Sequence, residues 1–225
     1  MMRARSLHPL LAVVLLAAPR PMSSTPAPEI AIEMRVVAHA PVEPRVLSLA
    51  RATTTTLVET TGVRVAWREC PAADVACASH PGNGGVVVRL VSSRLSNPRV
   101  CGGVIPAGAD GQVMLIFLTC HERLMETVRT MAAARSEPPL ATLEIGHLLG
   151  LTMAHELGHV LGLAHAPAGV MRARFDIADF RALRTSSLAF RSHEQRWMRQ
   201  AMLARRGGGQ PPFSTAVPAA GSKAP

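Results

Sequence analysis

Hydrophobic residues fall into five short segments with the pattern of β-strands, all within the first 119 residues. One of them, residues 86–91, is apolar except for Arg89, as in a strand buried on most of both faces. The last two flank residues 106–111, which contain one Pro and two Gly, and this arrangement predicts an antiparallel hairpin. The five predicted strands are 30–37, 63–67, 86–91, 100–105 and 112–119.

Segments with helical periodicity alternate with the first strands and dominate the second half of the chain. Residues 43–61 place apolar side chains on one face and lie between the first two strands. A strand–helix–strand succession implies parallel pairing through a right-handed crossover, so a mixed α/β fold is expected. A loop is predicted at 70–85, and further helices at 121–135, 140–161, 176–184 and 193–203.

The first residues have the composition of a secretory signal. Arg3 and Arg5 form a positive region, and residues 10–18 form an apolar run. This run is shorter than the roughly 20 apolar residues that span a bilayer, although an uncleaved anchor is an alternative. We therefore predict a signal peptide at residues 1–18 and a secreted or periplasmic protein.

Composition predicts one folded domain, at residues 30–206. The chain has 225 residues, of which 48% are hydrophobic, enough for a sizeable core. Aromatic residues make up only 3%, so aliphatic side chains must fill that core. Residues 19–29 are rich in Pro, Ser and Ala and predict a linker, and residues 207–225 predict a disordered tail.

The net charge of +9 comes almost entirely from arginine, since Lys223 is the only lysine. Such an excess predicts loose attraction to anionic surfaces, or simply a solvated arginine-rich surface. The arginines form no long run and have no aromatic residues interleaved, so specific nucleic-acid binding is not expected. A monomer without a transmembrane span is expected.

Candidate chemistry is concentrated between His155 and His165. His155 and His159 are four residues apart, which places both rings on one face of a helix. Gly162 can adopt a left-handed conformation that ends this helix, so that the chain returns and His165 approaches the pair. Three imidazoles leave the fourth tetrahedral position of one Zn²⁺ open, which is the pattern of a catalytic site. Glu156 follows the first ligand and is the candidate general base.

This stretch resembles the metzincin zinc peptidases, whose motif H-E-x-x-H-x-x-G-x-x-H is followed by a methionine-containing turn. The resemblance implies that Met171 lies beneath the three histidines. It also implies a twisted five-stranded sheet with one antiparallel edge strand, a long site helix and a small helical C-terminal subdomain. Gly102, Gly103, Val104 and Ile105 would then form the edge strand that binds the peptide substrate.

Two departures limit the assignment to a matrixin-like, minimal metzincin. Ala166 stands where matrixins carry Ser, and the spacing from His165 to Met171 is shorter than in typical matrixins. Ala173 occupies the place where astacins and serralysins carry a tyrosine that touches zinc, and this chain has no tyrosine. The alternative function is a non-catalytic, zinc-stabilised exported binding protein.

Four cysteines in an exported chain predict two disulfides, for which three connectivities exist. Cys101 and Cys120 lie almost symmetrically about the hairpin turn, which favours their pairing. Cys70 and Cys77 would then close a small loop, and free buried thiols are the alternative. The sequence around Cys101 faintly resembles the matrixin cysteine switch, but Val100 interrupts the Arg-Cys pair and the stretch lies within the predicted sheet.

Other polar residues near the motif have simpler explanations. His147 lies about 12 Å from His155 along the helix axis, too far to share an ion, so a satisfied or surface role is expected. The pairs His121-Glu122 and His193-Glu194 lack a second histidine and predict solvated faces. Asp176 and Asp179 are candidate ligands for a structural Ca²⁺, but two carboxylates are weak evidence for an oxygen cage.

Overall fold

The computed structural model describes residues 30–79, 84–92, 100–106, 112–135 and 138–207. The predicted signal peptide and linker, the hairpin turn except Pro106, and all of the predicted tail except Gly207 lie outside the described residues. Among those residues, no helix has the length and apolar content needed to cross a membrane.

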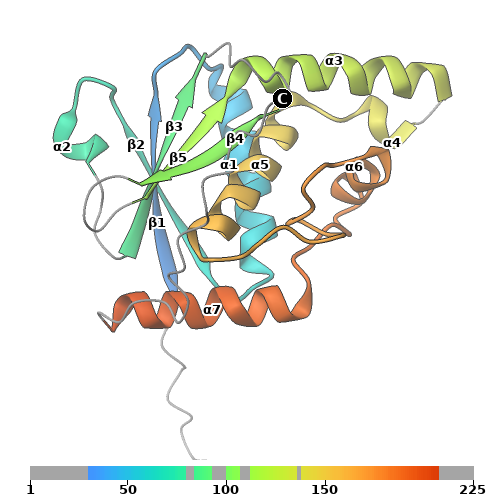
Figure 1. Ribbon diagram of the computed structural model, residues 1–225. Coiled ribbons are helices and arrows are strands. Elements are labelled where there is room, and N and C mark those ends of the chain that lie inside the picture. Colours follow the sequence, from blue (N-terminus) through green and yellow to red (C-terminus); the bar gives the residue numbers. More distant parts are fainter. Residues whose placement is uncertain (1–29, 80–83, 93–99, 107–111, 136–137, 208–225) are drawn as a thin grey trace, which may run out of the picture.

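The five strands form one sheet in the order β2-β1-β3-β5-β4 (Figure 1). Strand β1 pairs in parallel with β2 and β3, and β3 pairs in parallel with β5. Only β4 runs antiparallel, at the edge beside β5. The predicted mixed sheet with one antiparallel edge strand is thus confirmed. The strands are β1 Ala31–Ala38, β2 Arg64–Cys70, β3 Gly85–Val91, β4 Gly102–Pro106 and β5 Gln112–Phe117.

Seven helices are described. Two of them, α1 and α5, make a close pair that packs on one face of the sheet (Figure 1). The inward side chains of β1, which include Ile32, Met34 and Val36, are buried in the core on this side. The helices are α1 Pro44–Glu59, α2 Val75–Ala78, α3 Leu118–Arg135, α4 Pro138–Ala141, α5 Ile145–Val160, α6 Ile177–Arg184 and α7 Ser192–Arg206.

Glycine permits the close contact between α1 and α5. A Cβ built on Gly150 would lie 2.4 Å from the Ala50 carbonyl oxygen and 2.6 Å from Thr53 Cβ. The Thr54 hydroxyl donates a hydrogen bond of 3.0 Å across this contact to the Gly150 carbonyl. This packing holds α5 in a fixed position under the sheet, and α5 carries the candidate metal ligands.

The predicted helix 140–161 is wrong at its N-terminal end, because the chain forms two helices there, α4 and α5. Glu144 separates them in an extended conformation, with φ −117° and ψ 157°. A reciprocal capping box explains the interruption. The Glu144 side chain accepts from the backbone at His147, and the Glu144 amide donates to His147 Nδ1 at 3.0 Å.

The predicted loop at 70–85 contains the short helix α2. Its N-cap Asp74 accepts a hydrogen bond of 2.9 Å from the Cys77 amide, and Cys77 forms a disulfide with Cys70 at the end of β2. These cysteines belong to a second apolar cluster, together with Val37, Val87 and Val113.

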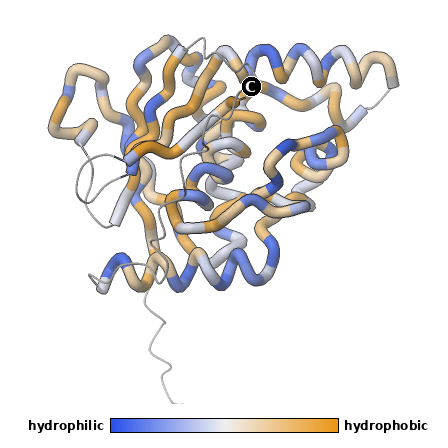
Figure 2. The backbone as a smooth tube through the Cα atoms, in the orientation of Figure 1, coloured by the Kyte–Doolittle hydropathy of each residue, from blue (hydrophilic) through white to orange (hydrophobic). Residues whose placement is uncertain are grey.

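The sheet strands are mostly hydrophobic, whereas the peripheral helices α3 and α7 carry many hydrophilic residues (Figure 2).

Candidate metal centre

Helix α5 presents two of the three predicted ligands. His155 is buried and His159 is partly buried, one helical turn further along. Glu156, the next residue after the first ligand, is only 7% exposed. The helix itself is almost wholly buried, so the orientation of these side chains is fixed by packing on both sides of α5.

A left-handed glycine returns the chain toward the helix. Gly162 has φ +86°, a conformation that glycine adopts without the steric cost of a Cβ. The Leu163 amide then bonds to the Gly158 carbonyl at 2.9 Å, and the Leu163 carbonyl accepts from His159 Nδ1 at 2.8 Å. This turn brings His165, which is solvent-exposed, back to the helical pair, as the sequence predicts.

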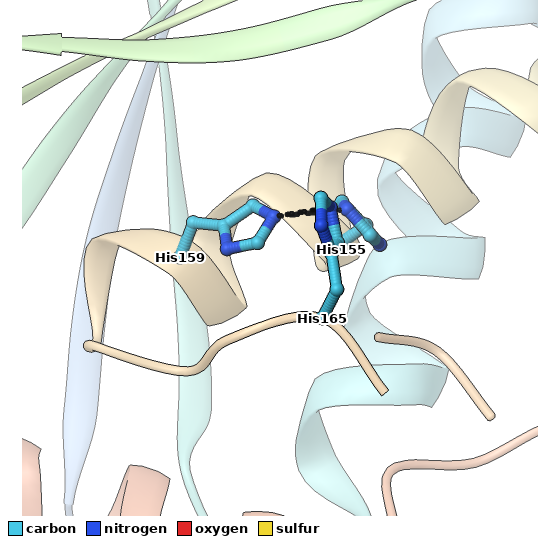
Figure 3. Close-up of side chains that lie close together, drawn as sticks. All are labelled: His155, His159 and His165. Atoms are coloured by element: carbon cyan, nitrogen blue, oxygen red, sulfur yellow. Dashed lines mark hydrogen bonds between the residues drawn. The ribbon is translucent and has the colours of Figure 1, made fainter. Parts of the chain in front are cut away.

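The three imidazoles converge on one point (Figure 3). His159 Nε2 lies 3.0 Å from His155 Nε2 and 3.2 Å from His165 Nε2. The Nδ1 atoms of His155 and His159 both face backbone carbonyls, of Val170 and Leu163, and must therefore carry their hydrogens. Their Nε2 atoms consequently direct lone pairs at each other, which is unfavourable unless a cation or proton lies between them.

This donor set fits Zn²⁺. Nitrogens bound tetrahedrally to zinc at about 2.0–2.1 Å would lie about 3.3 Å apart, close to the separations found here. Carbonyl acceptors on Nδ1 are also the usual partners that fix a zinc-binding histidine. Among the described residues, these histidines form the only group of three or more His, Cys, Asp or Glu side chains that could hold a metal ion.

Burial sets the protonation of these side chains. It lowers the pKa of His155 to about 4, and the neighbouring histidines add to this effect. Burial also lowers the pKa of His159, so both rings are neutral at pH 7 and able to bind a metal. For Glu156, burial raises the carboxyl pKa to about 7.

The segment after His165 supports the site from below. Gly169, with φ +79°, forms a turn in which the Ala166 amide bonds to the Met171 carbonyl at 2.8 Å. In the same turn the Val170 carbonyl accepts from His155 Nδ1 at 2.8 Å. Met171 is fully buried, and a Cβ built on Gly158 would lie 2.3 Å from its sulfur. The methionine therefore packs against the site helix at Gly158, which lies between the two helical ligands in sequence.

The edge strand β4 passes directly over Glu156. A Cβ built on Gly102 would lie 2.8 Å from Glu156 Oε1 and 2.8 Å from Thr152 Cγ2. Glycine at this position thus gives the carboxylate its space. The same construction on Gly103 meets nothing within 4 Å, so the two adjacent glycines have different surroundings.

A cleft of approximately 850 Å³ opens beside these residues. His155, Glu156 and His165 line it, and Gly102 contributes the rim at β4. Further lining comes from the first turns of α3 and from residues 172–175. The candidate metal centre therefore lies at the wall of an open cleft, where a substrate can reach it.

Both predicted disulfides are present, and one of them borders the cleft. Cys70 pairs with Cys77, and Cys101 pairs with Cys120, with Cα–Cα distances of 5.5 and 5.1 Å. Cys120 lies in the first turn of α3 rather than on a facing strand, so the second bridge ties the start of β4 to the start of α3. Because Cys101 is part of a disulfide, it offers no thiol to a metal, which agrees with the argument against a cysteine switch.

Each of the two histidine–glutamate pairs predicted to be solvated is wrong at one residue: His121 and Glu194 are buried, whereas Glu122 and His193 are exposed. His121 is fully buried: its Nδ1 donates to the Phe117 carbonyl at 2.9 Å, and its Nε2 accepts from the Thr152 hydroxyl at 2.8 Å. Burial lowers the His121 pKa to about 4. Glu194 is only 1% exposed and caps α7 by accepting from the Arg191 amide at 2.7 Å. Neither burial is visible in a local pattern, because each depends on packing against a distant element.

The other polar residues considered from the sequence have structural partners. His147 contacts the Glu144 amide and Arg184, so its expected satisfied role is confirmed. Asp176 caps α6, and its carboxylate and that of Asp179 both accept from Arg172, at 2.5 and 2.8 Å. The two aspartates thus bind an arginine and a helix N-terminus here.

Sequence reasoning missed the residues that complete the cleft. Arg123, Leu124, Arg174 and Phe175 all line it, and the Phe175 ring lies edge-on to His155 with centroids 5.7 Å apart. Only the position of Phe175 near the motif could have suggested such a role. The residues on α3 are more than 30 positions away in sequence, and their place depends on the Cys101–Cys120 bridge and on how α3 leaves the sheet.

No family model matches this chain, and no curated protein matches it. Among 16 solved chains that are similar to it, archaemetzincin from Methanopyrus kandleri has a TM-score of 0.49 and 17% identity, over 76% of this chain and 96% of that one. The ECX AB5 holotoxin in its GM1-bound form has a TM-score of 0.44 and 13% identity, over 78% of this chain and 80% of that one. Both likenesses are too distant to place the chain in a family.

Proposed function

We propose that this protein is a zinc-dependent endopeptidase of the metzincin type, in which His155, His159 and His165 hold the metal. The observation that carries the proposal is the convergence of three Nε2 atoms beside a buried carboxylate at the wall of an open cleft. Zinc in such a site supplies Lewis acidity and activates water near neutral pH.

Glu156 is the proposed general base. It lines the cleft next to His155 and His165, and no other carboxylate does so among the described residues. The attacking water gives its proton to the Glu156 carboxylate, which then delivers that proton to the leaving amine as the peptide bond breaks. Gly102 leaves space for the carboxylate, which has to contact first the water and then the leaving amine.

The free edge of β4 is the proposed binding site for the substrate backbone. The Phe117 amide donates to the Cys101 carbonyl at 2.9 Å, which makes these residues a hydrogen-bonded pair. In an antiparallel ladder the next pair is not bonded, so the backbone groups of Gly102, and again of Val104, face away from β5. An extended peptide can therefore add to this edge as another strand, with Gly103 and Ile105 between these positions.

Export is part of the proposal. Two disulfides suit an oxidising compartment, and the signal peptide predicted at residues 1–18 would direct the chain there. We propose that the domain acts as a monomer on peptide or protein substrates. The matrixin-like features expected from the sequence, in contrast, have no further support in the fold.

Paired measurements of zinc content and peptide cleavage test the proposal. Glu156→Ala should retain zinc but lose cleavage by about 10²–10⁴-fold, because general acid–base catalysis is removed while all three imidazoles remain. His165→Ala should lose both zinc and activity. His147→Ala should leave zinc content and cleavage unchanged, because its ring contacts Glu144 and Arg184 and is not a metal ligand.

A zinc-loaded parent that cleaves no peptide in a broad library would favour the non-catalytic alternative. A Glu156→Ala protein that cleaves as fast as the parent would exclude the proposed base. Absence of stoichiometric zinc after reconstitution would remove the metal assignment itself.

A further inference from the structure

Two arginines without partners line the cleft. Arg123 lies on the first turns of α3, and Arg174 lies three residues after Met171; both are exposed. Within the described part of the chain, neither guanidinium has a hydrogen bond or an ion pair. Both therefore retain all their donors for a ligand that enters the cleft.

Nearby acidic groups do not neutralise these two arginines. Arg172 also lines the cleft, but Asp176 and Asp179 already hold its guanidinium. Glu122 and Glu126 are neighbours of Arg123 on α3, yet neither lines the cleft. The only lining carboxylate is Glu156, which lies at the metal-site end under Gly102.

Apolar side chains line the same cleft as the two guanidiniums. Leu124 follows Arg123 on α3, while Phe175 follows Arg174 and contacts the ring of His155. Phe180, from α6, also lines this part and packs near Phe175, with ring centroids 6.5 Å apart. Such walls suit the aliphatic part of a side chain, while the arginines suit an anionic end.

We propose that this part of the cleft, formed by Arg123, Arg174, Leu124 and Phe175, binds a carboxylate of the peptide substrate. The inference rests on the proposed function, because it assumes that a peptide occupies the cleft. Guanidinium groups form charge-assisted, planar hydrogen bonds with carboxylates, which a neutral amide of the same shape does not match. The protein should therefore prefer peptides with an acidic group at a fixed distance from the bond that is cleaved.

The carboxylate can come from a Glu side chain or from the peptide's C-terminus, and a binding experiment separates these sources. The probe is an array of nonapeptides with an alanine background, in which each position in turn is Glu or Gln and each peptide ends in either a free acid or an amide. Binding is measured with the full chain carrying Glu156→Gln, zinc-loaded and metal-free, so that no cleavage is required.

At one or two positions we expect Glu peptides to bind roughly three- to tenfold more tightly than their Gln partners. The preference should decrease in 1 M salt, where the Debye length falls to about 3 Å. Arg123→Gln and Arg174→Gln should each reduce it. Arg129→Gln, an exposed arginine of α3 outside the cleft, is the matched control and should leave it unchanged.

Each outcome has a distinct meaning. Equal binding of Glu and Gln peptides at every position, or a preference that survives both arginine substitutions, would overturn the inference. A preference seen only for the free C-terminal acid supports carboxylate binding and identifies the terminus as its source. A Glu preference in a parent that cleaves nothing would defeat the proposed peptidase but keep this site, whereas cleavage without any acidic preference would do the reverse.

Discussion

Replacing Gly102 by alanine tests the site at its most crowded point. The added methyl would lie 2.8 Å from both Glu156 Oε1 and Thr152 Cγ2, and 2.9 Å from Glu156 Cγ. Ordinary contacts to a Cβ begin at 3.4 Å, so the atoms must separate by about 0.6 Å. Thr152 lies on the buried helix α5 and cannot move readily, so the displacement falls on the Glu156 side chain or on strand β4.

The expected effect is on catalysis more than on stability. A misplacement of about 1 Å at a reacting group can cost about 10²-fold in rate, so a shift of this size predicts roughly a tenfold loss in kcat/KM. Folding should change little, since β4 is an edge strand that can yield. Alanine also loses less backbone entropy on folding than glycine, by about 0.5–1 kcal/mol.

Gly103→Ala is the matched control, because its methyl meets nothing within 4 Å on the same strand. The measurements are kcat/KM on one peptide, zinc content and the thermal unfolding midpoint of both variants. Equal kcat/KM for the two variants at equal zinc content would refute the claim that Gly102 makes room for a working Glu156.

Three further predictions concern stability. Gly150→Ala should lower the free energy of unfolding by about 1–3 kcal/mol, since its methyl would meet the Ala50 carbonyl at 2.4 Å and backbone cannot rotate away; urea denaturation measures this. The His121 pKa is about 4 in the folded protein and 6.5 in the unfolded chain, so the unfolded chain binds the proton first as the pH falls. The free energy of unfolding should therefore decrease by about 3 kcal/mol between about pH 6.5 and pH 4. His121→Gln should remove this part of the pH dependence of stability. Replacing Cys101 and Cys120 together by serine should cost about 3 kcal/mol, checked by thermal unfolding under oxidising conditions.

Most of the fold is predictable because its determinants are local. The apolar run around Arg89 becomes the central strand β3, and the hairpin places β4 antiparallel at the edge. The proximity of the three histidines is predictable because helical spacing and one left-handed glycine, Gly162, determine the path of the chain between them. Where neighbouring residues alone determine the geometry, the sequence pattern is sufficient to predict it.

The errors arise where a residue's role depends on a partner far away in the sequence. The break between α4 and α5 requires Glu144 and His147 to cap each other, a contact that an apolar helical pattern conceals. His121 looks like a surface residue until α3 packs on α5 and Thr152 supplies the second hydrogen bond.

The same dependence explains the cleft. The metal-site part of its lining is encoded in one continuous stretch around Glu156, whereas another part is assembled from α3 and the segment that contains Arg174. Only folding, with the Cys101–Cys120 bridge at the start of α3, brings Arg123 and that segment to the same cleft. The chemistry of the site can therefore be anticipated from the sequence, but the groups that would select its substrate become visible only in three dimensions.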